Sequence, residues 1–196
     1  MFKSIIMGIS TLLIASIFSG CSYMNMGKVF VWDFSGETRT AYAEMMGVIG
    51  ETGDPAQAMM LEFKVEDPDL EEEEIIDSIN SVALEYNMMV VGEKNMFNLD
   101  DAKPQEVKHA RIIELCSLSV AKKMFNHSRY YGGFMPCRIV LVEYGNGDRY
   151  LITMDMTLAL YGGTDKKPIN EDLFQDMLRI KEAMAKIPER AAKGDF

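Results

Sequence analysis

The dipeptide Asn146-Gly147 constrains the fold more than any other feature of the sequence. Asn-Gly favours the two-residue turn whose twist suits a pair of antiparallel strands. The segment before it, residues 138–144, is apolar on both faces, as is typical of a central strand. The segment after it, residues 150–156, returns with alternating apolar side chains. We therefore expect a hairpin within a buried sheet.

Apolar residues at helical spacing predict helices that cover this sheet. The predicted helices are residues 68–86, 118–126 and a long one from about 171 to 188. Asp67 is the expected cap of the first, with Pro68 at its first helical position. Ser117 and Asn170 are the expected caps of the other two. Pro188 should end the last helix, and the tail beyond it should be loose.

The remaining apolar runs are interpreted as strands, and residues 38–50 as a short helix or loop. The predicted additional strands are residues 28–34, 58–65, 88–91 and 110–115. Strands and helices that alternate irregularly predict the α+β class. The expected architecture is a two-layer sandwich, with helices on one face of a mixed, mostly antiparallel sheet.

The N-terminus has the pattern of a secretory signal peptide. Lys3 gives a positive start, and Ile5 to Phe18 are fourteen mostly apolar residues without charge. This run is shorter than the roughly 20 residues that a spanning helix needs. It is followed by the small residues Ser19 and Gly20 and then by Cys21. We therefore predict that residues 1–20 are removed during export.

The four residues that end at Cys21, Phe18-Ser19-Gly20-Cys21, resemble the lipobox of bacterial lipoproteins. This resemblance implies that Cys21 is acylated and becomes the first residue of the mature chain, with residues 21–27 as a tether. Ser22 then favours the outer membrane, facing the periplasm, by the enterobacterial sorting rule. The alternatives are an ordinary signal peptide with Cys21 incidental, or an uncleaved anchor. Two or three acyl chains would hold the protein firmly at the membrane.

The charge of the mature chain argues against nucleic-acid partners. Without residues 1–20 the chain keeps 176 residues, enough for one domain with a proper core. It carries 19 basic and 30 acidic side chains, a formal charge of −11. Neither a basic patch nor interleaved basic and aromatic residues would offset this repulsion locally. We therefore expect no nucleic-acid binding.

Lipidation of Cys21 would leave two cysteines, Cys116 and Cys137. Cys116 precedes a predicted helix, whose dipole lowers the pKa of a thiol. If the flanking strands are parallel neighbours, the two thiols lie at opposite ends of the sheet, about 17 Å or more apart. If the strands are antiparallel, or the loop 128–136 folds back, the thiols could meet. The sequence leaves open two buried thiols, a disulfide or shared thiol site, and a metal or sulfur-carrying site.

Common catalytic motifs are missing from the sequence. It contains no C-x-x-C, G-x-S-x-G, Walker loop or H-E-x-x-H, and His109 and His127 do not have zinc-pair spacing. The seventeen methionines suggest Cu(I), but the three doublets are poor chelates because neighbouring side chains point apart. We therefore predict no cofactor and no metal, leave enzymatic activity open, and lean against it.

Several segments together resemble the domain of unknown function numbered 302. They are Ile112 to Cys116, Ala121-Lys122-Lys123, Phe134 to Ile139, Tyr144 and Met154-Asp155. The resemblance covers about residues 57–188 and implies a small two-layer α+β domain that often forms homodimers. It draws attention to Cys116, Cys137 and Asp155 as a candidate ligand or thiol site. Ser117-Leu118 and Met156 depart from the family pattern, which often has Asn-Pro and Pro at those places.

These observations divide the chain into a signal peptide (1–20), a lipidated tether (21–27), an N-terminal extension (28–56) and the family domain (57–190). Two functions are compatible with them. The first is a lipid-anchored binding or interaction module of the bacterial envelope, with an unknown small ligand or protein partner. The second is a thiol-dependent sulfur, redox or metal-handling protein that uses Cys116 and Cys137.

Overall fold

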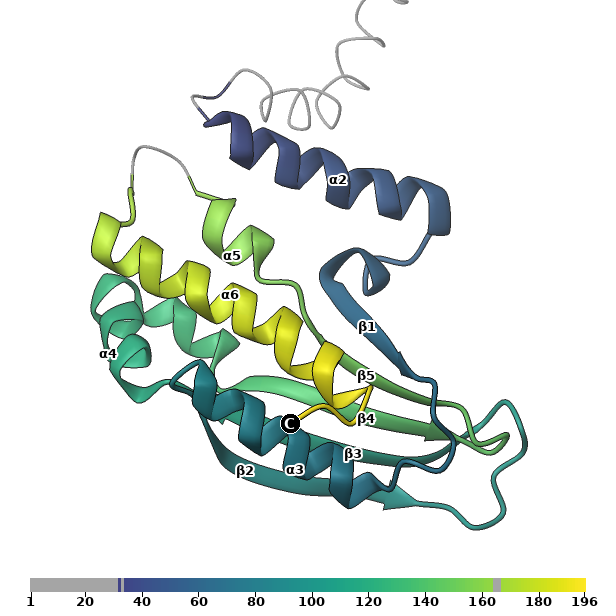
Figure 1. Ribbon diagram of the computed structural model, residues 1–196. Helices are drawn as coiled ribbons and strands as arrows, with labels where there is room; N and C mark the ends of the chain where they lie inside the picture. Colours follow the sequence, from purple (N-terminus) through teal and green to yellow (C-terminus); the bar gives the residue numbers. More distant parts are fainter. Residues whose placement is uncertain (1–31, 33, 164–166) are drawn as a thin grey trace, which may run out of the picture.

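The computed structural model describes residue 32 and residues 34–163 and 167–196. Figure 1 shows the helices and strands in this part of the chain. In chain order they are α2 (Gly36–Thr52), the 3₁₀ helix η1 (Gln57–Met59), β1 (Met60–Val65), α3 (Glu72–Glu85), β2 (Met89–Asn98), β3 (Val107–Cys116), α4 (Leu118–His127), the 3₁₀ helix η2 (Arg129–Phe134), β4 (Cys137–Tyr144), β5 (Arg149–Met154), α5 (Thr157–Tyr161) and α6 (Glu171–Ala191). The predicted signal peptide, Cys21 and the tether lie outside these residues.

The five strands form one sheet in the order β1-β5-β4-β3-β2. Every neighbouring pair among them is antiparallel, so the expectation of a mixed sheet is wrong in this respect. The reason is the connection between β3 and β4. α4 and η2 return the chain to the end of the sheet that β3 leaves, where Leu115 pairs with Cys137. The predicted hairpin is confirmed, with Glu143 opposite Arg149. Its loop has three residues, 145–147, instead of the expected two, and Gly147 has a φ of 90°.

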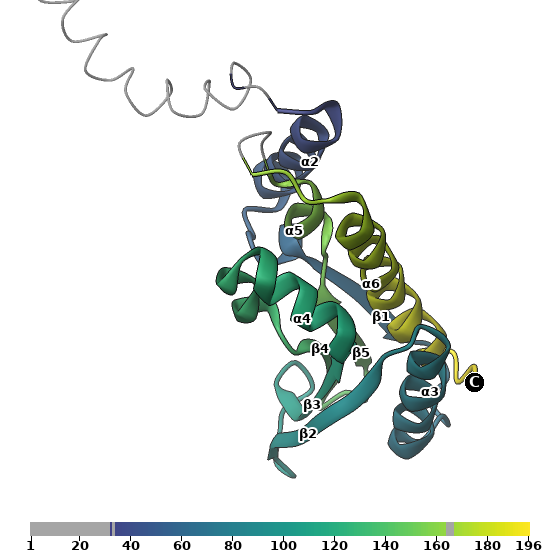
Figure 2. The same ribbon diagram turned by 90° about the vertical axis from the view of Figure 1, so that its left-hand side faces the viewer.

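Helices α3 and α6 pack on the same face of this sheet (Figure 2). The α+β class and the helical layer on the sheet are therefore confirmed. The core between the layers is formed by alternate strand residues and by one stripe from each helix. Its fully buried side chains include Ile75, Ile79, Ile113, Leu115, Ile139, Leu141, Leu151, Met184 and Ile187. α4 packs beside α6 at the end of the sheet where β3 ends.

Helix α3 begins later than predicted, at Glu72 instead of residue 68. Its cap is Glu71, in a reciprocal capping box with Glu74, so the assignment of Asp67 as the cap is wrong. The Asp67 carboxylate instead accepts a hydrogen bond from the backbone N–H of Asp69 at 2.9 Å. Arg149 donates to the backbone carbonyl of Asp67 at 2.9 Å and holds the segment before the helix against β5.

Asn170 caps α6 as predicted, but Pro188 does not end it. The helix continues to Ala191, because Ile187, Pro188 and Ala191 are all buried and their packing offsets the lost backbone hydrogen bond. The C-terminal tail is also not loose. Ser78 of α3 donates to the backbone carbonyl of Asp195, and the tail closes against that helix.

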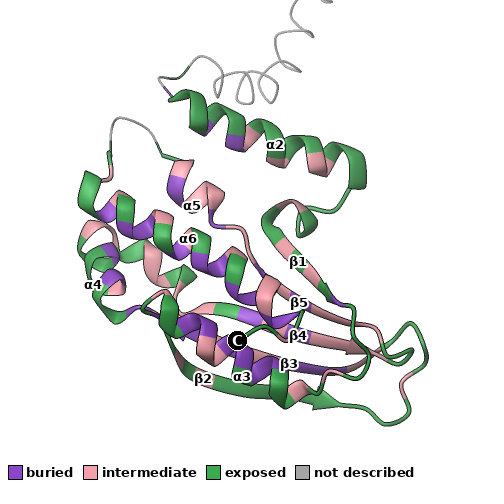
Figure 3. Ribbon diagram, viewed as in Figure 1, coloured by how far each residue is buried: buried purple, intermediate pink, exposed green. Residues whose placement is uncertain are grey.

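α2 lies apart from the two layers and is mostly exposed along its length (Figure 3). It confirms the helical alternative for residues 38–50. The predicted strand at 28–34 falls largely outside the described residues, and Trp32 and Phe34 are not in a strand. Neither α5 nor η2 was predicted. Within the described ranges, no helix is long and apolar enough to cross a membrane.

Candidate functional site

A groove lies between α2 and the rest of the protein. The N-terminal half of α2 is held on α5 by two side-chain hydrogen bonds. The Thr38 hydroxyl donates to the backbone carbonyl of Tyr161, and the Tyr42 hydroxyl donates to that of Gly162 at 3.1 Å. Thr38 and Ala41 are the buried residues of this helix. Beyond α5, α2 also contacts η1, and most of its remaining residues are exposed.

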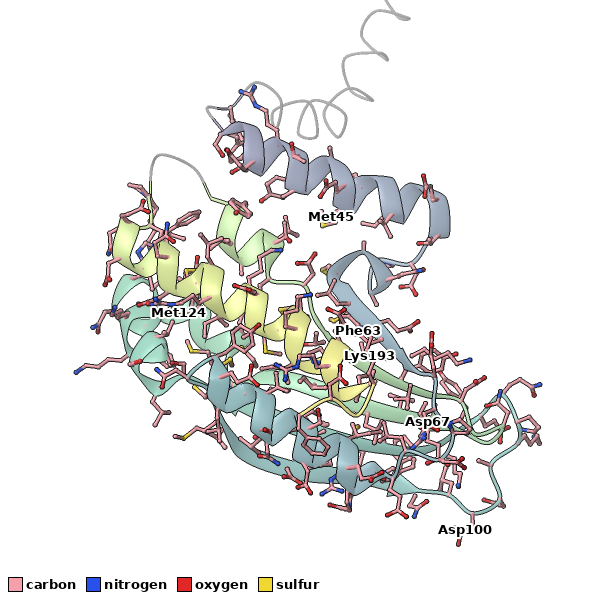
Figure 4. All side chains as sticks on the ribbon, viewed as in Figure 1. Met45, Phe63, Asp67, Asp100, Met124 and Lys193 are labelled. Carbon is pink, nitrogen blue, oxygen red and sulfur yellow. The ribbon has the colours of Figure 1, made fainter. Side chains whose placement is uncertain are left out.

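One face of α2 forms the upper wall of the groove. Ala41, Met45 and Val48 line it at spacings of four and three residues, and Met45 projects from α2 towards the body of the protein (Figure 4). The groove encloses about 660 Å³ and is mostly apolar. Its other walls come from η1, η2, the end of β5 and α5. They include Ala58, Met59, Met60, Tyr130, Tyr131, Phe134, Met154, Asp155, Leu158 and Gly162.

Asp155 follows β5 and lines this groove. One carboxylate oxygen accepts hydrogen bonds from the backbone N–H of Thr157 at 2.8 Å and from its hydroxyl at 2.6 Å. The backbone N–H of Asp155 donates to the carbonyl of Met59 at 2.9 Å. Asp155 therefore fixes the end of β5 to η1 through its backbone and contacts the first residue of α5 through its carboxylate.

The two cysteines lie at a different place, at the ends of β3 and β4 near α4. Cys116 is the last residue of β3, and Cys137 pairs with the preceding residue, Leu115. Both are free thiols and half-buried. They line one small cavity of about 20 Å³, which is enough for about one water molecule. The antiparallel topology thus brings the thiols to one cavity without a disulfide in the described structure.

Burial makes both thiols poor nucleophiles at neutral pH. It raises the pKa of Cys116, although this residue precedes a helix whose dipole favours the thiolate. The expectation of a lowered pKa at Cys116 is therefore wrong, because desolvation outweighs the dipole. Burial, together with the neighbouring Cys116, raises the pKa of Cys137 to about 11.

Alkylation of Cys137 by iodoacetamide at pH 8 should be about 100-fold slower in the folded protein than in urea, because its pKa of about 11 lies some two units above the ordinary value. The rate in the folded protein should rise about tenfold per pH unit up to that pKa. Peptide mass spectrometry would follow Cys137 and Cys116 separately. Equal rates in the folded and unfolded chains would contradict a desolvated thiol.

The candidate residues therefore fall into two places. Cys116 and Cys137 share the small cavity, whereas Asp155 lines the groove under α2, and Phe134 lines both. Sequence reasoning did not find the groove. The spacing of Ala41, Met45 and Val48 indicates an apolar face on α2, but it does not show what this face contacts. Among the described residues, no group of three His, Cys, Asp or Glu side chains is arranged to hold a metal ion.

Comparisons with known proteins identify the domain but give no activity. The family model described as "Domain of unknown function DUF302" matches residues 63–187. No curated protein matches. One solved structure that matches is described as an uncharacterized conserved protein DUF302 from Bacillus stearothermophilus. It is 15% identical, with a TM-score of 0.49, and the alignment covers 68% of this chain and 98% of that one.

Proposed function

The chain belongs to the DUF302 family, and from this premise we propose that it is a lipid-anchored binding module that takes up an apolar small molecule in the groove under α2. The observation that carries the proposal is the groove itself. Its volume of about 660 Å³ lies within the range of roughly 300 to 1,000 Å³ that is usual for small-molecule sites. Its lining is mostly apolar with a few polar groups, as such sites require.

The charges at the groove narrow the class of ligand. Glu44 and Asp155 contribute carboxylates, and neither lysine nor arginine is found among the described residues that line it. Carboxylates repel an anionic headgroup and attract a cationic one. The ligand that fits best therefore has an apolar body and a neutral or cationic polar end.

The groove combines the family domain with a segment outside the family match. α2 and η1 precede residue 63, whereas η2, the end of β5 and α5 lie within the matched residues 63–187. A ligand bound there would be enclosed by α2, which contacts the rest of the protein through α5 and η1. Ligand binding would bury apolar surface of α2 and stabilise its position.

N-phenyl-1-naphthylamine, a neutral apolar fluorophore, is expected to bind the groove and gain fluorescence. Met45→Glu should weaken this binding at least about tenfold, because it places a charge in the apolar wall. Met46→Glu is the matched control, since Met46 is the next residue on α2, is 44% exposed and does not line the groove. Titration of the fluorescence measures both variants, and circular dichroism checks their folding. Equal affinities for Met45→Glu and Met46→Glu would rule out the groove as the site.

The lipid anchor is proposed on the signal-like residues 1–20 and on the lipobox resemblance at Cys21. Acylation would keep the groove beside a membrane, where apolar and amphipathic molecules are concentrated. The proposed location is the outer membrane, on its periplasmic side. A homodimer, implied by the family resemblance, stays a prediction that solution mass measurements would test.

Cys21→Ala should prevent acylation, because the residue that carries the lipid is gone. The protein should then be found in the soluble fraction and should no longer need detergent for its extraction. Intact mass of the protein purified from its envelope, together with membrane fractionation, measures this result. Ser22→Ala is the control and should leave the acyl mass unchanged. An intact mass without added acyl groups in the unsubstituted protein would disprove the anchor.

A further inference from the structure

A second site, separate from the groove, lies in the small cavity between β3, β4, α4 and α6. Eleven residues line it, and six of them carry sulfur. The sulfur-bearing residues are Met88, Cys116, Met124, Met135, Cys137 and Met156. Met88, Met124 and Met156 are 2%, 4% and 4% exposed, so these side chains are held within the core. They come from different elements that only the tertiary structure brings together.

We propose that this cavity binds one Cu(I) ion through thiol and thioether sulfur. Thiolates and thioethers are soft ligands that select Cu(I), whereas carboxylates and carbonyls select hard cations. No carboxylate or imidazole is among the described residues that line the cavity, which disfavours calcium, magnesium and an ordinary zinc site. The volume of about 20 Å³ fits a single ion better than an organic molecule.

The number of protons released when Cu(I) binds depends on the net charge that the apolar cavity can hold. A cysteine thiol has an ordinary pKa of about 8.5 and is therefore mostly protonated at neutral pH. A net charge in an apolar cavity is costly, so one thiolate for each Cu(I) gives the favoured neutral complex. On binding, one S–H bond breaks, its proton goes to solvent, and a sulfur–copper bond forms without any change of oxidation state. Affinity should therefore rise with pH.

The methionine doublet Met88-Met89 offers a matched pair of variants. Met88 lines the cavity, whereas Met89 begins β2, is 49% exposed and does not line it. Met→Leu keeps nearly the same volume and removes only the sulfur, so folding should be preserved in both. Met88→Leu should weaken Cu(I) binding at least about tenfold, while Met89→Leu should leave it unchanged.

The experiment uses the full mature protein, reduced and kept free of oxygen, with Cu(I) in competition against bathocuproine disulfonate. One equivalent of Cu(I) should be retained and one proton released, and Cys137→Ser should weaken binding at least about tenfold. Cys21 is the same in every sample, so differences between variants report only the cavity. Absence of retained Cu(I), or equal losses in Met88→Leu and Met89→Leu, would overturn the proposal. Binding of N-phenyl-1-naphthylamine reports the groove separately, so either site can fail without the other.

Discussion

Leu151→Ala should lower the free energy of unfolding by about 3 to 4 kcal/mol, as expected for a leucine removed from a packed core. Leu151 is fully buried in β5, where it pairs with Phe63 of β1 and Leu141 of β4. Its side chain belongs to the core, on the strand that α6 contacts. Truncation therefore removes apolar burial and leaves a cavity that the neighbouring strands cannot close. Urea denaturation followed by circular dichroism would measure the change.

Ile152→Ala is the matched control for this prediction. Ile152 is the next residue of β5, and its side chain points to the opposite face of the sheet, where it is only partly buried. Ile152→Ala should lower the free energy of unfolding by less than about 1.5 kcal/mol, because Ile152 buries less apolar surface than Leu151 does. A cost equal to that of Leu151→Ala would contradict helices packed on one face. If that cost also increased with protein concentration, the outer face would be buried against a second copy.

Asp176→Asn should lower the free energy of unfolding by about 2 kcal/mol at neutral pH, through the loss of charge-assisted hydrogen bonds. The Asp176 carboxylate is buried in α6, with a side chain that is 5% exposed. It accepts a hydrogen bond from Lys123 of α4 at 2.6 Å and another from Arg179. This contact ties α4 to α6 and so supports the cavity between them.

The difference in the free energy of unfolding between the original protein and Asp176→Asn should depend on pH. The hydrogen bond from Lys123 lowers the pKa of Asp176 in the folded state, although burial acts in the opposite direction. A carboxyl with a lowered folded pKa contributes stability above its unfolded pKa of about 3.9 and loses it as the pH falls through the folded pKa. The difference should therefore be complete at pH 6 to 7 and disappear in stronger acid.

Asp172→Asn is the control for the carboxylate contact. Asp172 also accepts a hydrogen bond from Lys123, at 2.7 Å, but its side chain is 78% exposed. Water screens such a pair, so its removal should cost less than about 1 kcal/mol. Denaturation at several pH values would compare the two variants. If both variants lost the same stability at neutral pH, burial of Asp176 would not be the reason for its importance.

Elements with a strong local signal were predicted well, and their ends were decided by side-chain contacts. The hairpin at Asn146-Gly147 and the cap at Asn170 are local features, and the structure confirms both. Asp67-Pro68 is also a strong start signal, but Glu71 and Glu74 form the actual cap. Pro188 lies within a helix because buried neighbours compensate for its missing N–H group. Such competition between local and tertiary contacts cannot be judged from residue types alone.

The sequence named candidate residues, but it did not show how they are arranged. Cys116, Cys137 and Asp155 stood out in the sequence, yet Asp155 lines a different hollow from the two thiols. The dipole argument at Cys116 failed because the thiol is partly buried, and the sequence does not specify that burial. The groove under α2 is formed by segments more than a hundred residues apart, such as Met45 and Leu158. A pattern among neighbouring residues does not indicate that two such distant segments lie side by side.

The sequence by itself determined the α+β class, the hairpin and the amphipathic stripes, because each depends on the order of neighbouring residues. It also carries the signal and lipobox pattern on which the proposed anchor at Cys21 rests. Only the tertiary structure decided that β3 and β4 are antiparallel and that six sulfur-bearing side chains line one cavity. It likewise placed α2 over the apolar groove. These are long-range contacts, which depend on how elements pack and not on the local preference of any one of them.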